Sequence, residues 1–171
     1  VYDTRFYGLD NQKLSDSQES KLLEEGIAVN STASLDFSNK NAISALGNPT
    51  EGALLLWLHN NNVDYRELRE DATILAELPF STERKYMATV VESSLLPQKK
   101  ILYVKGAPEI VLSLCKQVEG NVKNEEIAKQ LHDYQNQAMR TLGFAYQILD
   151  DGDKTIADGK VVAKNLTFEG I

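Results

Sequence analysis

The 171-residue chain has little cysteine and histidine and no long apolar run, and each shortage excludes a class of protein. Its one cysteine, Cys115, cannot form a disulfide within the chain, which excludes a disulfide scaffold and suits a reducing compartment. The longest apolar run, Ala53 to Leu58, is far shorter than the roughly 20 residues that span a bilayer, so we expect no direct membrane contact. The start at Val1 has neither a signal-peptide pattern nor an initiator methionine, which favours a piece of a longer protein.

Basic residues are scarce as well. The chain has 18 Lys and Arg against 25 Asp and Glu, a formal net charge of −7. This balance disfavours binding to nucleic acid, which needs clustered cations. An anionic small ligand would need a few cations gathered locally. His59 and His132 lie far apart without nearby cysteines or paired acids, so we expect them at the surface and expect no metal site.

The residues that are present suit one folded domain spanning 1–171. Hydrophobic residues make up 42% and charged residues 25% of the sequence, which is typical of globular proteins. Apolar spacing predicts helices at 16–33 and 124–139, and start signals predict two more, at 48–60 and after Gly106. Segments rich in Val, Ile and Tyr predict strands at 88–94, 100–104, 142–149 and 160–168. Because these elements interleave without a regular repeat, we predict an α+β fold.

The clearest local signal is the start of the helix at 48–60. Asn48 is a good N-cap, and Pro49 is tolerated at the first helical position. Glu51 stands three residues after the cap, where its carboxylate can accept a hydrogen bond from the N–H of Asn48 in a capping box.

Several familiar motifs are incomplete. The segment 47–52 has the glycine spacing of a phosphate-binding loop, but Ala53-Leu54 stand where that loop needs Lys and Ser or Thr. No G-x-G-x-x-G run is present. The acidic residues of 150–158 do not have EF-hand spacing. The tripeptide at 153–155 starts like the phosphorylation motif D-K-T-G-T, but Ile156-Ala157 replace its Gly-Thr. We expect a solvated turn there.

Four separated segments resemble the motifs of one family, in that family's order. They are G-N-P-T-E-G-A-L at 47–54, F-S-T-E-R-K-Y-M at 80–87, K-G-A-P-E at 105–109 and R-T-L-G-F-A-Y at 140–146. Together they resemble the nucleotide-binding domain of the P-type cation-transporting ATPases, and their wording is most like the type II calcium-transporting pumps. The segment 166–171 is similar to the strand that leads back into the phosphorylation domain, so we expect a fragment cut from hinge to hinge.

The resemblance implies a twisted antiparallel sheet of about six strands flanked by helices, in a cytoplasmic domain of an integral membrane protein. It implies ATP and ADP as ligands, with Mg²⁺ arriving on the nucleotide, and the phosphorylation and actuator domains of the same parent chain as partners. The implied function is to bind adenosine and deliver the γ-phosphate to an aspartate on the phosphorylation domain. The isolated fragment is not expected to hydrolyse ATP, because that aspartate is absent.

Two residues of these segments suit a purine. Phe80 offers an aromatic face on which a base can stack, worth on the order of 1–3 kcal/mol. A buried core position is the alternative for Phe80. Glu51 can accept a hydrogen bond from the exocyclic amine of adenine, where guanine has an acceptor instead. The capping box is the alternative for Glu51.

Two cations are candidates for the rest of the nucleotide. Lys105 ends a predicted strand beside a glycine turn, where it can lean over the base or meet phosphate oxygens. A solvated strand end is the alternative. Arg140 lies between a predicted helix and a strand, and its planar guanidinium suits a phosphate. Capping of the preceding helix is its alternative role.

The resemblance adds further binding residues. Met87 and Leu142 are expected to line the apolar side of the base pocket, where lining the pocket and packing in the core are nearly the same role. The family often has a cation where Thr82 stands, so Arg84 or Lys85 is expected to supply that phosphate contact. The remaining members are neighbours within the motifs, namely Thr50, Gly106 and Ala107.

Two rival functions stay open. The chain could be a degenerate interaction module that keeps the fold without binding nucleotide. A self-contained phosphohydrolase is disfavoured, because no D-K-T-G-T nucleophile motif is present. The transported ion is chosen by transmembrane helices outside this chain, so calcium follows only from the wording of the motifs.

Overall fold

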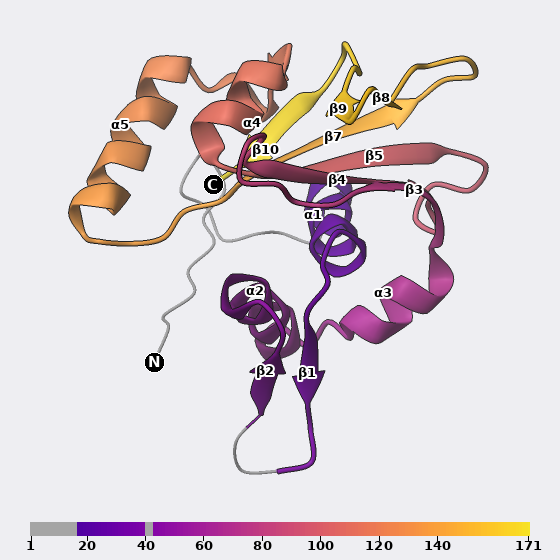
Figure 1. The fold of residues 1–171 in the computed structure, drawn as a ribbon, viewed down its shortest axis with the longest axis vertical. Coiled ribbons are helices and arrows are strands. Elements are labelled where there is room, and N and C mark those ends of the chain that lie inside the picture. Colours follow the sequence, from indigo (N-terminus) through magenta and orange to yellow (C-terminus); the bar gives the residue numbers. More distant parts are fainter. Residues whose placement is uncertain (1–16, 40–42) are drawn as a thin grey trace.

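The computed structural model describes residues 17–39 and 43–171. It has a central sheet with helices on both faces (Figure 1). One face carries α4 (Pro108–Leu114) and α5 (Asn124–Asn136). The opposite face carries α1 (Gln18–Val29), α2 (Pro49–Asn60) and α3 (Tyr65–Asp71). Among the described residues, none of these helices is both long and apolar enough to cross a bilayer.

The central sheet has six strands in the order β3-β4-β5-β7-β10-β6. In chain order they are β3 (Thr73–Leu78), β4 (Tyr86–Glu92), β5 (Lys100–Gly106), β6 (Gln117–Val118), β7 (Gly143–Leu149) and β10 (Thr167–Gly170). Neighbouring strands are antiparallel except β10 and β6, which run parallel at one edge. The predicted α+β fold with a sheet of about six strands is confirmed, and the parallel pair is an addition to it.

Three smaller elements complete the fold. The strands β1 (Ser34–Asp36) and β2 (Ser44–Leu46) form an antiparallel pair next to α2. The strands β8 (Ile156–Ala157) and β9 (Lys160–Val161) form a second pair after β7. A short 3₁₀ turn, η1 (Glu119–Asn121), follows β6.

Side chains along β4, β5 and β7 alternate between the two faces of the sheet. One cross-strand row consists of Ala88, Val104 and Ala145, and it belongs to the core under α4 and α5. The next row consists of Met87, Lys105 and Phe144. Phe144 packs with leucines of α1 and α2, so this second row faces those helices. A lysine in an otherwise apolar row therefore points from the sheet toward α2.

Most predicted elements are confirmed. The helix α2 begins after Asn48, whose Oδ1 accepts hydrogen bonds from the N–H groups of Thr50 and Glu51. The segments predicted as paired strands are β4 and β5, which pair antiparallel. The helix predicted to reach 139 ends at Asn136, because Ala138 has a left-handed backbone with φ 57°.

The strand predicted at 160–168 is wrong. The strand β9 ends at Val161, and β10 begins only at Thr167. Asp158 and Gly159 have φ values of 50° and 67°, the left-handed pair of a tight hairpin turn. The turn pairs β9 with β8 instead of extending it into the central sheet. The sequence patterns also predict neither α3 nor β3.

Candidate functional site

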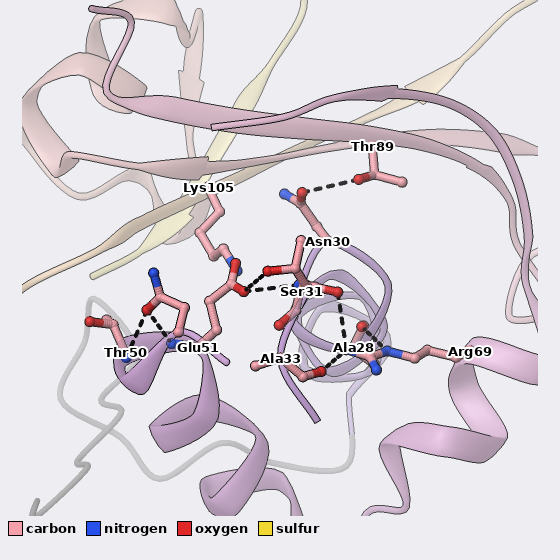
Figure 2. Close-up of polar contacts among 11 residues, drawn as sticks. Ala28, Asn30, Ser31, Ala33, Thr50, Glu51, Arg69, Thr89 and Lys105 are labelled. Carbon is pink, nitrogen blue, oxygen red and sulfur yellow. Dashed lines mark hydrogen bonds and ion pairs between the residues drawn. The ribbon is translucent and has the colours of Figure 1, made fainter. Parts of the chain in front are cut away.

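A buried ion pair between α2 and β5 forms the centre of the candidate site (Figure 2). The Nζ of Lys105 lies 3.0 Å from the Oε1 of Glu51, and the two residues are 3% and 6% exposed. This pair joins the T-E-G-A-L segment to the K-G-A-P-E segment across 54 positions of sequence. Lys105 is therefore not a solvated strand end.

The other carboxylate oxygen of Glu51 is held by the segment that follows α1. Oε2 accepts hydrogen bonds of 2.9 Å from the Thr32 N–H and 2.8 Å from the Thr32 hydroxyl. The capping box, the alternative for Glu51, is wrong, because its carboxylate bonds Thr32 and Lys105, while Asn48 caps α2 with its own side chain. Three donated hydrogen bonds fix the orientation of the carboxylate.

The charges of the pair stabilise each other. Burial alone raises the pKa of the Glu51 carboxyl, but the charge of Lys105 and the hydrogen bonds from Thr32 and Lys105 outweigh it and hold that pKa below its usual value. Burial lowers the pKa of the Lys105 ammonium, and the charge of Glu51 opposes this shift. The opposite charge of each group therefore offsets part of the desolvation of the other.

Two glycines of the motifs allow close packing around this pair. A Cβ on Gly52 would lie 2.2 Å from the Cβ of Ala45, so glycine lets α2 approach β2. A Cβ on Gly106 would lie 2.3 Å from the carbonyl oxygen of Lys85, which also accepts a 2.9 Å hydrogen bond from the N–H of Ala107. The backbone of the F-S-x-x-R-K-x-M segment therefore lies directly against that of K-G-A-P-E.

Arg140 contacts the same end of α2. Its Nη1 donates a 3.2 Å hydrogen bond to the Oγ1 of Thr50, the residue before Glu51. The guanidinium thus bonds α2 rather than the carbonyl groups at the end of α5. The exposed Arg140 side chain brings the fourth motif to the site.

Phe80 lies in the connection between β3 and β4, and 55% of its surface is exposed. The alternative that Phe80 is a buried core residue is wrong. The strand β4 begins at Tyr86 and places Met87 opposite Lys105. The connection that carries Phe80 therefore leaves the sheet at the end where Lys105 meets Glu51.

The two cations expected to replace the one missing at Thr82 differ in their surroundings. The Arg84 guanidinium donates to the carbonyl of Pro79, so it is bound to its own loop. Lys85 is exposed and has a left-handed backbone with φ 61°. Of the two, Lys85 has the side chain that is open to solvent.

The expected apolar lining residues are packed in the fold. Met87 is buried beside Lys105 in the cross-strand row. Leu142 is partly buried against the cluster that contains Phe144 and the leucines of α2. Their role in lining a base pocket stays a prediction.

Sequence reasoning missed two residues that complete this arrangement. Thr32 bonds Glu51. Arg69 of α3 bonds the carbonyl groups of Ser31 and Ala33, the two neighbours of Thr32 in the chain (Figure 2). Neither residue lies in a recognisable motif. A side chain that bonds distant backbone carbonyls leaves no periodic signal in the sequence, so no pattern could have identified Arg69.

The described residues contain no group of three or more His, Cys, Asp or Glu side chains that could hold a metal ion. His59 and His132 are exposed, and the His59 ring lies 5.5 Å from that of Phe37. Asp153, from the incomplete D-K-T-G-T segment, accepts hydrogen bonds from the Asp150 N–H and the Gln147 amide. Its carboxylate therefore stabilises a turn.

The four motifs that resemble the P-type ATPases meet around this ion pair and its neighbours in one fold. The chain belongs to the P-type ATPases, because the family model described as P-type ATPase, cytoplasmic domain N, matches residues 19–171. The resemblance seen in the motifs is confirmed.

Named relatives agree with this assignment. The chain is 32% identical over 158 residues to the calcium-transporting ATPase PAT1 of Dictyostelium discoideum, covering 88% of this chain and 14% of that protein. It is 30% identical over 146 residues to calcium-transporting ATPase 1 of Lactococcus lactis, covering 81% and 16%. It is 30% identical over 194 residues to calcium-transporting ATPase 2 of Cryptococcus neoformans, covering 96% and 14%. The chain thus spans only 14 to 16% of the length of these relatives.

Proposed function

We propose that this domain binds the adenosine part of ATP and, within a P-type cation pump, delivers the γ-phosphate to an aspartate on the separate phosphorylation domain. The observation that carries the proposal is the 3.0 Å contact between Glu51 and Lys105, which joins two of the family's motifs. Such a domain contributes orientation and proximity rather than covalent chemistry. ADP would use the same contacts.

Glu51 selects adenine in this proposal. An ionised carboxylate has about four acceptor sites, of which Thr32 occupies two and Lys105 one. The remaining site, on Oε1, accepts a hydrogen bond from the exocyclic amine of adenine. Guanine has a carbonyl oxygen at the corresponding position and cannot donate. The low pKa of Glu51 keeps this acceptor ionised at neutral pH.

Exposed side chains hold the rest of the nucleotide. The ring of Phe80 is free to stack on the base, since most of its surface faces solvent. Arg140 and Lys85 are the exposed cations for the phosphates. Lys105 is too buried to act mainly on phosphates. Its role is to keep Glu51 charged and in place, with its aliphatic stem beneath the base.

The parent protein is proposed to be a calcium pump, since the similar proteins named above are calcium-transporting ATPases. This domain would lie on the cytoplasmic side and work with the phosphorylation and actuator domains of the same chain. Mg²⁺ would arrive on the nucleotide, where it neutralises phosphate charge. Among the described residues, no group of three or more His, Cys, Asp or Glu side chains could hold the ion without the nucleotide.

The proposal is tested by titrating the domain with ATP and with GTP, by calorimetry, in wild type and in Glu51→Gln. Wild type should prefer ATP. In Glu51→Gln the ratio of ATP affinity to GTP affinity should fall about tenfold, as expected for the loss of one hydrogen bond to a charged group. Phe80→Ala should weaken both nucleotides by about 1–3 kcal/mol. The exposed Ile148→Ala on β7 is the matched control and should change neither.

The rival interaction module predicts a different result. It would give no saturable response to ATP in the wild-type domain, whatever the effect of the variants. Magnesium-dependent phosphate release from the pure domain would contradict the absence of a nucleophile.

A further inference from the structure

Arg69 of α3 bonds the backbone of Ser31 and Ala33, the residues on either side of Thr32 (Figure 2). Its Nε donates a 2.7 Å hydrogen bond to the carbonyl of Ala28 in the last turn of α1. Its Nη2 donates to the carbonyls of Ser31, at 3.1 Å, and Ala33, at 2.9 Å. One guanidinium therefore connects the end of α1 to both neighbours of Thr32.

The guanidinium is itself held firmly. Its central carbon lies 4.8 Å from the centroid of the Tyr65 ring, and the Tyr65 hydroxyl accepts a 2.9 Å hydrogen bond from the N–H of Leu35. Burial lowers the pKa of Arg69, but an arginine stays charged at any physiological pH. A lysine could not replace it, because a single ammonium cannot reach three carbonyls that the planar fork spans.

Thr32 passes this restraint to the ion pair. Its N–H and hydroxyl both bond the Oε2 of Glu51, whose Oε1 accepts from Lys105. We propose that Arg69 is a positioning residue for base selection, acting through Thr32 on the Glu51 carboxylate. This inference rests on the function proposed above, because it concerns the same adenine contact.

The physical reason is the direction of the free acceptor site on Glu51. With Thr32 fixed, the carboxylate cannot rotate, so its remaining lone pair keeps one direction. If the 31–33 segment becomes less ordered, the Glu51 carboxylate can rotate about its terminal side-chain torsion, and Lys105 alone then sets its orientation. The adenine amine then loses a fixed acceptor, whereas stacking on Phe80 is unaffected. Loss of Arg69 should therefore reduce selectivity more than it reduces overall binding.

The test is Arg69→Lys, titrated with ATP and with GTP. ATP affinity should fall about tenfold, equal to about 1.4 kcal/mol, while GTP affinity should change less than about twofold. Arg66→Lys is the matched control on the same helix, because the exposed Arg66 bonds Asp64 of its own cap and lies over the Phe37 ring, away from the 31–33 segment. It should change neither affinity.

A second variant covers the case in which Arg69→Lys does not fold. Thr32 is exposed, and valine has nearly the same shape as threonine. Thr32→Val therefore keeps the backbone N–H that bonds Glu51 but removes the hydroxyl donor. It should lower the ATP/GTP ratio about threefold, because one of the two Thr32 hydrogen bonds is lost.

The outcomes separate the two proposals. If wild type prefers ATP but both Arg69→Lys and Thr32→Val keep the wild-type ratio, the positioning role is overturned and the proposed function stands. Equal losses for ATP and GTP in Arg69→Lys, with a lower melting temperature, would also overturn it, since that is what a purely structural role predicts. If wild type binds neither nucleotide, the proposed function fails, and the positioning role fails with it.

Discussion

Replacing Lys105 with methionine is the sharpest perturbation of the buried ion pair. Methionine keeps most of the apolar stem but removes the charge, so Glu51 becomes a buried carboxylate with hydrogen bonds only from Thr32. Removing one partner of a buried pair costs about 3–5 kcal/mol. Because the two bonds from Thr32 remain, we expect the lower end, about 3 kcal/mol. For a domain of this size that loss lowers the melting temperature by about 6–12 °C.

The assay is urea unfolding followed by circular dichroism, in a double-mutant cycle. Its members are wild type, Lys105→Met, Glu51→Gln and the double variant. The double variant should be more stable than Lys105→Met, because no unpaired charge is left buried. Lys100→Met, at the exposed end of the same strand, is the control and should stay within about 0.5 kcal/mol of wild type.

Two results would refute this reasoning. One is a stability loss for Lys105→Met no larger than that for Lys100→Met. The other is simple additivity of the two single changes, since groups in direct contact should couple by at least about 0.5 kcal/mol.

The same cycle has a defined pH dependence. The folded pKa of Glu51 is held below its unfolded value of about 4.3, so the pair contributes stability above that pH. This contribution is lost as the pH falls through the folded pKa. Wild type should therefore lose more stability than Glu51→Gln during acid titration below about pH 4.3. Parallel curves for the two proteins would contradict the shift.

Three further predictions concern stability, measured by urea unfolding. Gly106→Ala should lower the free energy of unfolding by about 1–3 kcal/mol, because the new Cβ meets the Lys85 carbonyl. An unchanged urea midpoint would contradict that contact. Asn48→Ala should cost about 1 kcal/mol through the lost cap of α2, and Asn48→Asp should retain the stability. Burial, aided by the charges of Glu119 and Glu19, raises the pKa of Glu169 well above its usual value. Wild type should therefore lose stability as the pH rises above about 4.3, and Glu169→Gln should be more stable than wild type at pH 7.

Short-range signals in the sequence predicted much of this fold. Asn48 and Pro49 predicted the start of α2, since capping depends on residues only a few positions apart. The strands β4 and β5 were predictable from their β-branched and aromatic residues. The hairpin at Asp158-Gly159 carried a usable signal too, but the apolar residues that follow it suggested one long strand at 160–168.

The site was only partly predictable. The motifs identified Glu51 and Lys105, but local patterns suggested a helix cap for the first and a solvated end for the second. Their actual contact depends on the pairing of strands and the packing of α2 on the sheet. The contribution of Arg69 could not be predicted from the sequence. Its partners are backbone carbonyls at least 36 positions away, and every residue has such a carbonyl.

Nuclear Overhauser contacts between bound ATP and the labelled domain would test most directly whether one purine site is built around the Glu51–Lys105 pair. We predict contacts from the adenine protons to the ring of Phe80, with a shifted amide resonance for Thr32 on saturation. Saturable ATP binding with adenine contacts confined to another surface, such as the one around Ile148, would contradict this.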